Sequence, residues 1–155
     1  MSLEAGDKAP DFTLPADGGG TVSLKALKGK PVVLYFYPKD DTSGCTAEAC
    51  AFRDAHPDFS RVKAEIVGIS RDSVASHDEF KQKFKLPFPL ASDEDGTVCQ
   101  AYGVWVEKSM HGRKYMGIER STFLIDAKGA VRKVLRKVKV PGHAEEVLEA
   151  VRALK

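Results

Sequence analysis

Apolar and polar residues follow one another along this chain in patterns that predict alternating strands and helices. Residues 32–37 form a continuous apolar run of strand length, typical of a central strand buried on both faces, and residues 65–70 form a second buried strand. Residues 43–56 follow the first run and are expected to be helical, with the helix ending near Pro57. Apolar residues spaced three and four apart predict a helix over residues 73–84 and a closing amphipathic helix over residues 142–154.

Shorter segments complete the pattern: residues 12–14, 21–24, 89–91, 96–102, 120–126 and 130–138. The first two flank a glycine-rich turn and predict an N-terminal β-hairpin, and the last two predict a late antiparallel hairpin. A short extended piece and a short helix are expected between them. The order β–α–β–α, then a hairpin and a helix, describes an α/β domain of the thioredoxin-like class. The N-terminal hairpin and an insertion at residues 87–118, before the late hairpin, are additions to that minimum.

Composition and charge narrow the class of protein. With 155 residues, 43% apolar and 30% charged, residues 1–155 are expected to form one globular domain. The net charge is +2, and acidic and basic residues are interspersed along the chain, so the charge pattern does not indicate a surface that binds nucleic acid or an anionic membrane. No apolar stretch approaches the roughly 20 residues that span a bilayer, and the start lacks the features of a secretory signal. Three cysteines fit a reducing compartment, so the cytoplasm is the expected location.

The chemistry of the chain is expected at Cys45. This cysteine lies just past a predicted strand, in the first turn of a predicted helix, where free backbone N–H groups and the helix dipole favour a thiolate. Thr42 lies three residues earlier across a tight turn, so its hydroxyl can face the sulfur. Pro38 ends the strand and can shield the pocket, and Arg120 opens a later strand from which its guanidinium could complete the site.

The spacing Pro38-x-x-x-Thr42-x-x-Cys45, together with an arginine before a late strand, resembles the peroxiredoxin active site. Further segments are similar to the bacterioferritin comigratory protein, or peroxiredoxin Q, subfamily: residues 44–46, the cysteine five residues after Cys45, and residues 117–123. The resemblance runs from residues 6–12 to the last helix. One departure is Ser43, where many members carry proline, and we expect from it a slightly more mobile loop and the same chemistry.

The resemblance implies a role for each residue. Cys45 would be the peroxidatic thiolate, Thr42 a hydroxyl contact, and Arg120 the cation that favours the thiolate and binds peroxide. Glu48 would orient an arginine, and Cys50 would be the resolving thiol. The activity implied is that of a thiol peroxidase without a bound cofactor or metal, which reduces hydrogen peroxide and organic hydroperoxides through a sulfenic acid and an intramolecular disulfide. A thioredoxin-type or glutaredoxin-type reductant would recycle it, and relatives of this kind suggest a monomer.

Helix geometry adds a constraint on Cys45 and Cys50. In a regular helix, residues five apart have Cα atoms about 8.6 Å from one another. A disulfide needs Cα atoms within roughly 7 Å. If the two cysteines form a disulfide, the first turns after Gly44 must therefore unwind, and the site must switch between a folded and an unwound form.

Other functions remain open at this point. A thiol–disulfide oxidoreductase on the same fold would normally carry Cys-x-x-Cys, whereas the spacing here is longer. A redox sensor or holdase could use the same switch without turnover, and a one-cysteine mechanism would leave Cys50 inert. The third thiol, Cys99, is expected in the core because no residue near it suggests activation.

Several residues outside the motif could also have been functional, and we consider the histidines and the aromatic residues of the insertion. The four histidines, including His77, show no metal-ligand spacing and are expected to be structural or exposed, and C-x₄-C is not the usual zinc pair. Trp105, Met110 and Tyr115 either form an apolar collar at the site or pack in the core.

Overall fold

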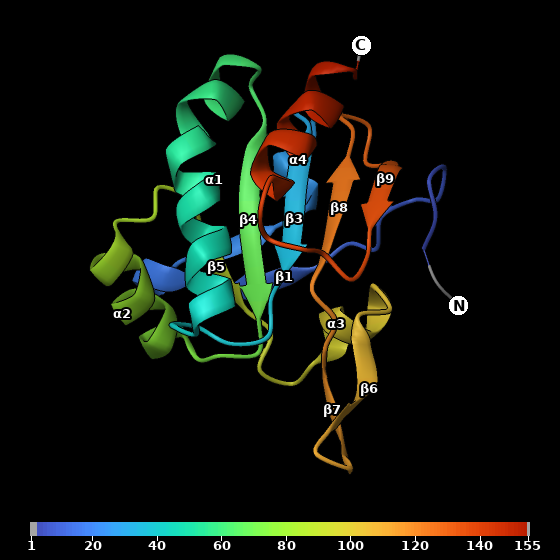
Figure 1. Cartoon of the computed structure of the whole chain (residues 1–155). Helices are drawn as coiled ribbons and strands as arrows, with labels where there is room; N and C mark the ends of the chain where they lie inside the picture. Colours follow the sequence, from blue (N-terminus) through green and yellow to red (C-terminus); the bar gives the residue numbers. More distant parts are fainter. Residues whose placement is uncertain (1–2, 155) are drawn as a thin grey trace.

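The structure is a computed structural model that describes residues 3–154. Its centre is a five-stranded sheet with the order β5-β4-β3-β8-β9 (Figure 1). The strands are β3 (Val32–Phe36), β4 (Glu65–Ser70), β5 (Leu90–Ser92), β8 (Ser121–Ile125) and β9 (Val131–Leu135). β3, β4 and β5 run parallel, while β8 pairs antiparallel with β3 and β9 antiparallel with β8. The sheet is therefore mixed, with β3 at its centre.

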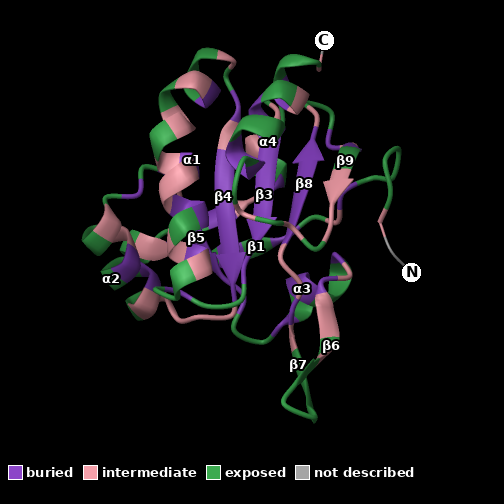
Figure 2. Ribbon diagram, in the orientation of Figure 1, coloured by how far each residue is buried: buried purple, intermediate pink, exposed green. Residues whose placement is uncertain are grey.

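β3 is buried on both faces, as its continuous apolar run predicts. Leu34 and Phe36 point into a core shared with the N-terminal segment. Val33 and Tyr35 point into the opposite core, beneath the helices. Figure 2 shows β3, β4 and β8 as the buried centre of the molecule. Because both faces are covered, the strand can deliver the following loop to a fixed position.

Helices cover one face of the sheet, and the N-terminal segment covers the other. α1 (Ser43–Arg61) and α4 (His143–Arg152) lie on the first face, and α2 (Val74–Phe84) lies beside the β5 edge (Figure 1). The remaining elements are β1 (Thr13–Pro15), η1 (Asp17–Gly19), β2 (Thr21–Ser23), η2 (Lys25–Leu27) and α3 (Thr97–Ala101). The predicted thioredoxin-like α/β class and the N-terminal hairpin are confirmed. Among the described residues, no helix is long and apolar enough to cross a membrane.

The first helix is longer than the sequence predicts. α1 does not end near Pro57 but passes through it and continues to Arg61. A proline inside a helix removes one backbone hydrogen bond and crowds the preceding turn. Here the continuation buries Phe59 completely and packs its ring on Phe52, with centroids 6.0 Å apart. Burial of the Phe59 side chain offsets the loss of this hydrogen bond, so the helix continues past Pro57.

The insertion contains a hairpin that the sequence reading missed. β6 (Trp105–Met110) pairs antiparallel with β7 (Arg113–Ile118) and extends away from the main sheet (Figure 1). His111 and Gly112 connect the strands with φ values of 51° and 78°, the left-handed pair of a tight hairpin turn. Its residues are mostly exposed or half-buried (Figure 2), so apolar side chains do not alternate strongly along its strands.

Candidate active site

Cys45 lies at the start of α1, where the chain turns back after β3. Only 1% of the residue is exposed. Thr42 is the N-cap residue, and the first hydrogen bond of the helix runs from the N–H of Thr46 to the carbonyl of Thr42, at 2.8 Å. The N–H groups of residues 43–45 therefore precede the hydrogen-bonded part of the helix, and the positive end of the helix dipole faces the sulfur.

The Arg120 side chain reaches the Cys45 sulfur from the start of β8, the strand that pairs with β3. It stands immediately before β8, whose first residue, Ser121, pairs with Phe36 at the end of β3. This register brings Arg120 to the edge of the sheet from which the Cys45 loop emerges. Its Nη2 donates to Cys45 Sγ at 3.3 Å, and its Nη1 donates to Glu48 Oε1 at 2.6 Å. One planar guanidinium thus binds both the thiol and a carboxyl group.

Glu48 is buried one helical turn after Cys45. The residue is 1% exposed, and its Oε2 has no hydrogen-bond partner among the described residues. Burial raises the pKa of the Glu48 carboxyl to about 7, against the opposing effect of Arg120. For Arg120, burial opposes the charge, but Glu48 and Cys45 outweigh it and raise the pKa of the guanidinium. Arg120 is therefore a permanent cation beside the sulfur.

Pro38 and Thr42 lie in the turn that connects β3 to Cys45. The Thr42 hydroxyl donates its hydrogen to the carbonyl of Lys39 at 3.0 Å, so it can only accept a hydrogen bond from a further partner. The α1 N-terminus has no side-chain cap bond as a result. Pro38 is exposed and lines a groove of about 400 Å³ with, among others, Trp105 and Tyr115. Met110, by contrast, is 57% exposed and does not line this groove.

Lys108 is a cation of the groove that Pro38 lines, and the sequence analysis did not identify it. It lies on β6 and lines the same groove as Pro38. Burial lowers the pKa of its ammonium group, the charge of Arg120 lowers it further, and Cys45 opposes the shift. The hairpin was not predicted, so no pattern in the sequence placed this lysine beside the groove.

The three cysteines are all free thiols. Cys50 is half-buried on α1, which is unbroken from Ser43 to Arg61, so both Cys45 and Cys50 lie within a continuous helix. Cys99 belongs to α3 and is fully buried in the opposite core. Burial, together with the nearby Asp93, raises the pKa of the Cys99 thiol well above its ordinary value. The predicted core position of Cys99 is confirmed.

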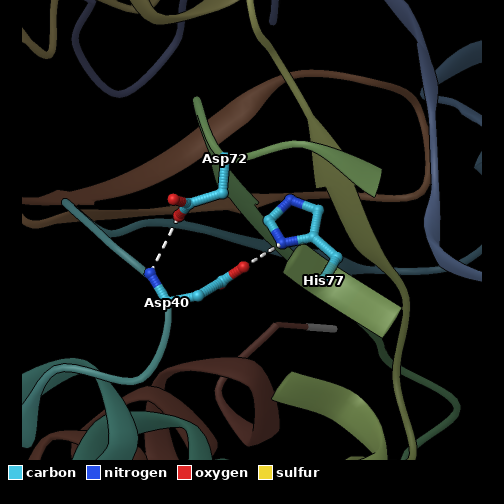
Figure 3. Close-up of side chains that lie close together, drawn as sticks. All are labelled: Asp40, Asp72 and His77. Carbon is cyan, nitrogen blue, oxygen red and sulfur yellow. Dashed lines mark hydrogen bonds and ion pairs between the residues drawn. The ribbon is translucent and has the colours of Figure 1, made fainter. Parts of the chain in front are cut away.

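A buried polar cluster lies beneath the turn that leads to Cys45 (Figure 3). Asp40 follows β3, Asp72 follows β4, and His77 lies in the second turn of α2. Asp40 and Asp72 follow adjacent parallel strands, whose carboxyl ends meet at one edge of the sheet, so this placement was readable from the sequence order. The sequence analysis expects His77 to be either structural or exposed, and the structure shows it fully buried.

The cluster has the composition of a metal site but is closed by its own hydrogen bonds. The Asp40 carboxylate accepts from the Tyr37 hydroxyl at 2.6 Å and from the Ser76 hydroxyl at 2.8 Å. His77 Nε2 lies 3.0 Å from the carbonyl oxygen of Ala91, which can only accept, so this nitrogen carries hydrogen and has no lone pair for a metal. The arrangement is therefore better suited to holding the loop than to holding an ion.

Comparisons with known proteins agree with this geometry. Residues 5–134 match the family model described as AhpC/TSA family. The chain is 51% identical to Peroxiredoxin Bcp of Bacillus subtilis, over 98% of this chain and 97% of the relative. It is 44% identical to Peroxiredoxin Bcp of Escherichia coli K12, over 94% of each.

Solved structures give the same answer. A structure of Xanthomonas campestris bacterioferritin comigratory protein, studied for alkyl peroxide reduction, superposes with a TM-score of 0.91 at 46% identity, covering 97% of this chain and 98% of that one. A Xylella fastidiosa PrxQ variant superposes with a TM-score of 0.94 at 41% identity, covering 99% and 98%.

Proposed function

This chain belongs to the AhpC/TSA family and is a peroxiredoxin of the Bcp, or peroxiredoxin Q, group; from that membership we propose that Cys45 is its peroxidatic residue. The observation that carries the proposal is the Arg120 guanidinium, which binds the Cys45 sulfur and the Glu48 carboxyl at once. A fixed cation 3.3 Å from a sulfur at a helix N-terminus stabilises the thiolate that attacks peroxide.

The first step oxidises Cys45. The thiolate sulfur attacks the terminal oxygen of a hydroperoxide, the S–O bond forms, and the O–O bond breaks. The transferred hydroxyl gives a sulfenic acid, and the leaving oxygen takes a proton to depart as water or an alcohol. Arg120 and the free N–H groups at the start of α1 would stabilise the charge on both oxygens. The Thr42 hydroxyl donates its own hydrogen to Lys39, so its oxygen would accept a hydrogen bond from the hydroperoxide O–H and orient it.

The second step joins Cys45 to Cys50. The Cys50 thiol attacks the sulfenic sulfur, an S–S bond forms, and water leaves. Because both residues lie within continuous α1, the first turns of the helix must unwind before the sulfurs can meet. A sulfenic acid that waits for this unwinding is open to further oxidation. The unwinding equilibrium therefore governs both recycling and inactivation.

A dithiol protein of the thioredoxin or glutaredoxin type would supply two electrons and two protons to restore both thiols. The substrates would be hydrogen peroxide and organic hydroperoxides. The groove lined by Pro38 would contact the organic part of the larger hydroperoxides. An intramolecular disulfide needs no second subunit, which supports action as a monomer. Three free thiols suit a reducing compartment, so we place its action in the cytoplasm.

Turnover with a reductant tests the proposal. With thioredoxin, thioredoxin reductase and NADPH, the wild-type protein should consume hydrogen peroxide continuously. Cys45→Ser should be inactive, and Cys50→Ser should react once and then stop because its sulfenic acid lacks a partner. Activity in Cys45→Ser would overturn the assignment. Faster oxidation of Cys45 by a protein disulfide than by peroxide would instead favour a thiol–disulfide oxidoreductase.

A further inference from the structure

Side chains of α2 bind the turn between β3 and α1 and fix its position. His77 is fully buried, and its Nδ1 lies 2.7 Å from Asp40 Oδ2 (Figure 3). The backbone of Asp40 is fixed separately, because its N–H donates to Asp72 Oδ2 at 2.8 Å. The side chain and the main chain of one loop residue are thus both anchored to the part of the chain that follows β4.

The hydrogen-bond pattern specifies the charge of His77. Its Nε2 carries hydrogen because the Ala91 carbonyl can only accept. A carboxylate oxygen at 2.7 Å from Nδ1 also only accepts, so Nδ1 carries hydrogen as well and the ring is an imidazolium. The charged groups that face the ring are Asp40 and Asp72; burial opposes its charge, but these contacts outweigh burial and raise the pKa of His77. Tyr37, 3.4 Å away, is neutral because burial raises the pKa of its phenol.

The next residue of the turn also needs support. Asp41 has φ of 60°, a left-handed conformation that costs a non-glycine residue conformational energy. Its carboxylate is paired with Lys83 of α2 at 2.8 Å, although both side chains are largely exposed. Two consecutive aspartates of the turn are therefore each held by a cation on α2. Of the two pairs, the Asp40–His77 pair is buried, and it is the stronger anchor.

We propose that His77 is a positioning residue for the peroxidatic centre: as an imidazolium bound to Asp40, it fixes the Asp40–Thr42 turn that starts α1 and so holds Cys45 in the folded, peroxide-attacking form. The inference rests on the proposed function of Cys45 for its kinetic consequences. The protonation of His77 follows from geometry alone. Release of this anchor shifts the site toward the unwound form.

The two steps of the reaction respond to such a release in opposite directions. Peroxide attack needs the folded site with Arg120 at the sulfur, so a weaker anchor slows the oxidation of Cys45. Disulfide formation needs the unwound form, so the same change speeds the joining of Cys45 to Cys50. A general loss of stability in the core would not separate the two rates in this way.

Two substitutions at one position isolate the loop contact. In His77→Asn, the side-chain amide nitrogen can take the place of Nδ1 and still donate to Asp40. In His77→Gln, it can take the place of Nε2 and still donate to Ala91, but the Asp40 contact is lost. Each variant keeps one of the two hydrogen bonds of the ring, so they differ in which element remains attached. His56→Gln, at a half-buried position of α1, is the control for the change of residue type.

The assay is stopped-flow fluorescence of the single tryptophan, Trp105, which lines the groove with Pro38. We expect His77→Gln to slow peroxide oxidation roughly tenfold or more and to accelerate disulfide formation, since it removes the His77 donor from the buried Asp40 carboxylate, whereas His77→Asn loses the charge but keeps a donor at that place. His77→Asn and His56→Gln should stay within about threefold of wild type. If His77→Gln does not fold, Ser76→Ala, which removes one bond to Asp40, should change both rates in the same directions by about two- to threefold.

A spectroscopic readout is independent of activity. In the wild-type protein at pH 7, proton–nitrogen NMR spectra should show a proton on both ring nitrogens of His77. A single protonated ring nitrogen, or equal rates in His77→Asn and His77→Gln, would overturn the inference. If wild-type Cys45 does not react with peroxide, the proposed function fails instead, and the NMR result still decides the state of His77.

Discussion

Replacing Glu48 by glutamine removes a carboxyl group from the centre of the site and leaves its shape almost unchanged. Glu48 is 1% exposed, its Oε1 binds Arg120 at 2.6 Å, and its Oε2 has no partner among the described residues. The amide oxygen of glutamine can still accept from Arg120. The substitution therefore tests the carboxyl charge and its proton, and little else.

The expected magnitude follows from the pKa of Glu48, which burial raises from 4.5 to about 7. Because the folded protein holds this proton more tightly than the unfolded chain, Glu48 contributes stability fully below pH 4.5. That contribution is lost as the pH rises through about 7. One pKa unit corresponds to about 1.4 kcal/mol, so the loss between pH 5 and pH 8 is roughly 2.5 kcal/mol.

Urea unfolding of the reduced protein at pH 5, 6, 7 and 8 measures this loss. The free energy of unfolding of wild type should fall relative to that of Glu48→Gln by roughly 2.5 kcal/mol across the series. Glu149→Gln is the matched control, because Glu149 also binds an arginine at 2.6 Å but its side chain is 69% exposed. Its curve should run parallel to wild type. Parallel curves for Glu48→Gln would refute the argument that burial dominates the charge of Glu48.

Two further predictions concern residues around the site. A methyl group at position 44 would lie 3.2 Å from Arg120 Nη2, so Gly44→Ala should displace the guanidinium and slow Cys45 oxidation roughly tenfold or more. The higher helix propensity of alanine should at the same time stabilise the protein by about 1 kcal/mol. An unchanged oxidation rate in stopped-flow experiments would contradict this prediction. Cys99 should resist iodoacetamide in the native protein at pH 8, because it is buried and its thiol pKa is raised, and should react only after unfolding. Early labelling of Cys99 in a peptide map would count against its inert role.

The central parts of the fold and of the site were predictable because local patterns determine them. The apolar run of β3 specifies a strand buried on both faces, and a cysteine after such a strand at a helix start needs no tertiary information to be recognised. Arg120 was predictable by its position before a late strand. Its contact with Cys45 then depends on one pairing, Phe36 with Ser121, which the topology supplies.

The parts that were missed depend on contacts distant in sequence or on weak patterns. Pro57 predicts a helix end, but the burial of Phe59 extends α1 beyond it. Lys108 lies on an exposed hairpin whose strands lack a clear apolar alternation, so neither the hairpin nor the lysine could be placed. Asp40 and His77 are 37 residues apart in the chain, and no local sequence motif indicates that they are in contact.

The central claim is that Cys45 is oxidised by peroxide and then bonded to Cys50 after local unwinding. The most direct measurement is to mix the fully reduced protein with one equivalent of hydrogen peroxide, record the intact mass, and map the disulfides by peptide. The account predicts a loss of two hydrogens and a Cys45–Cys50 link. A slow reaction, or oxidation centred on Cys99, would contradict it.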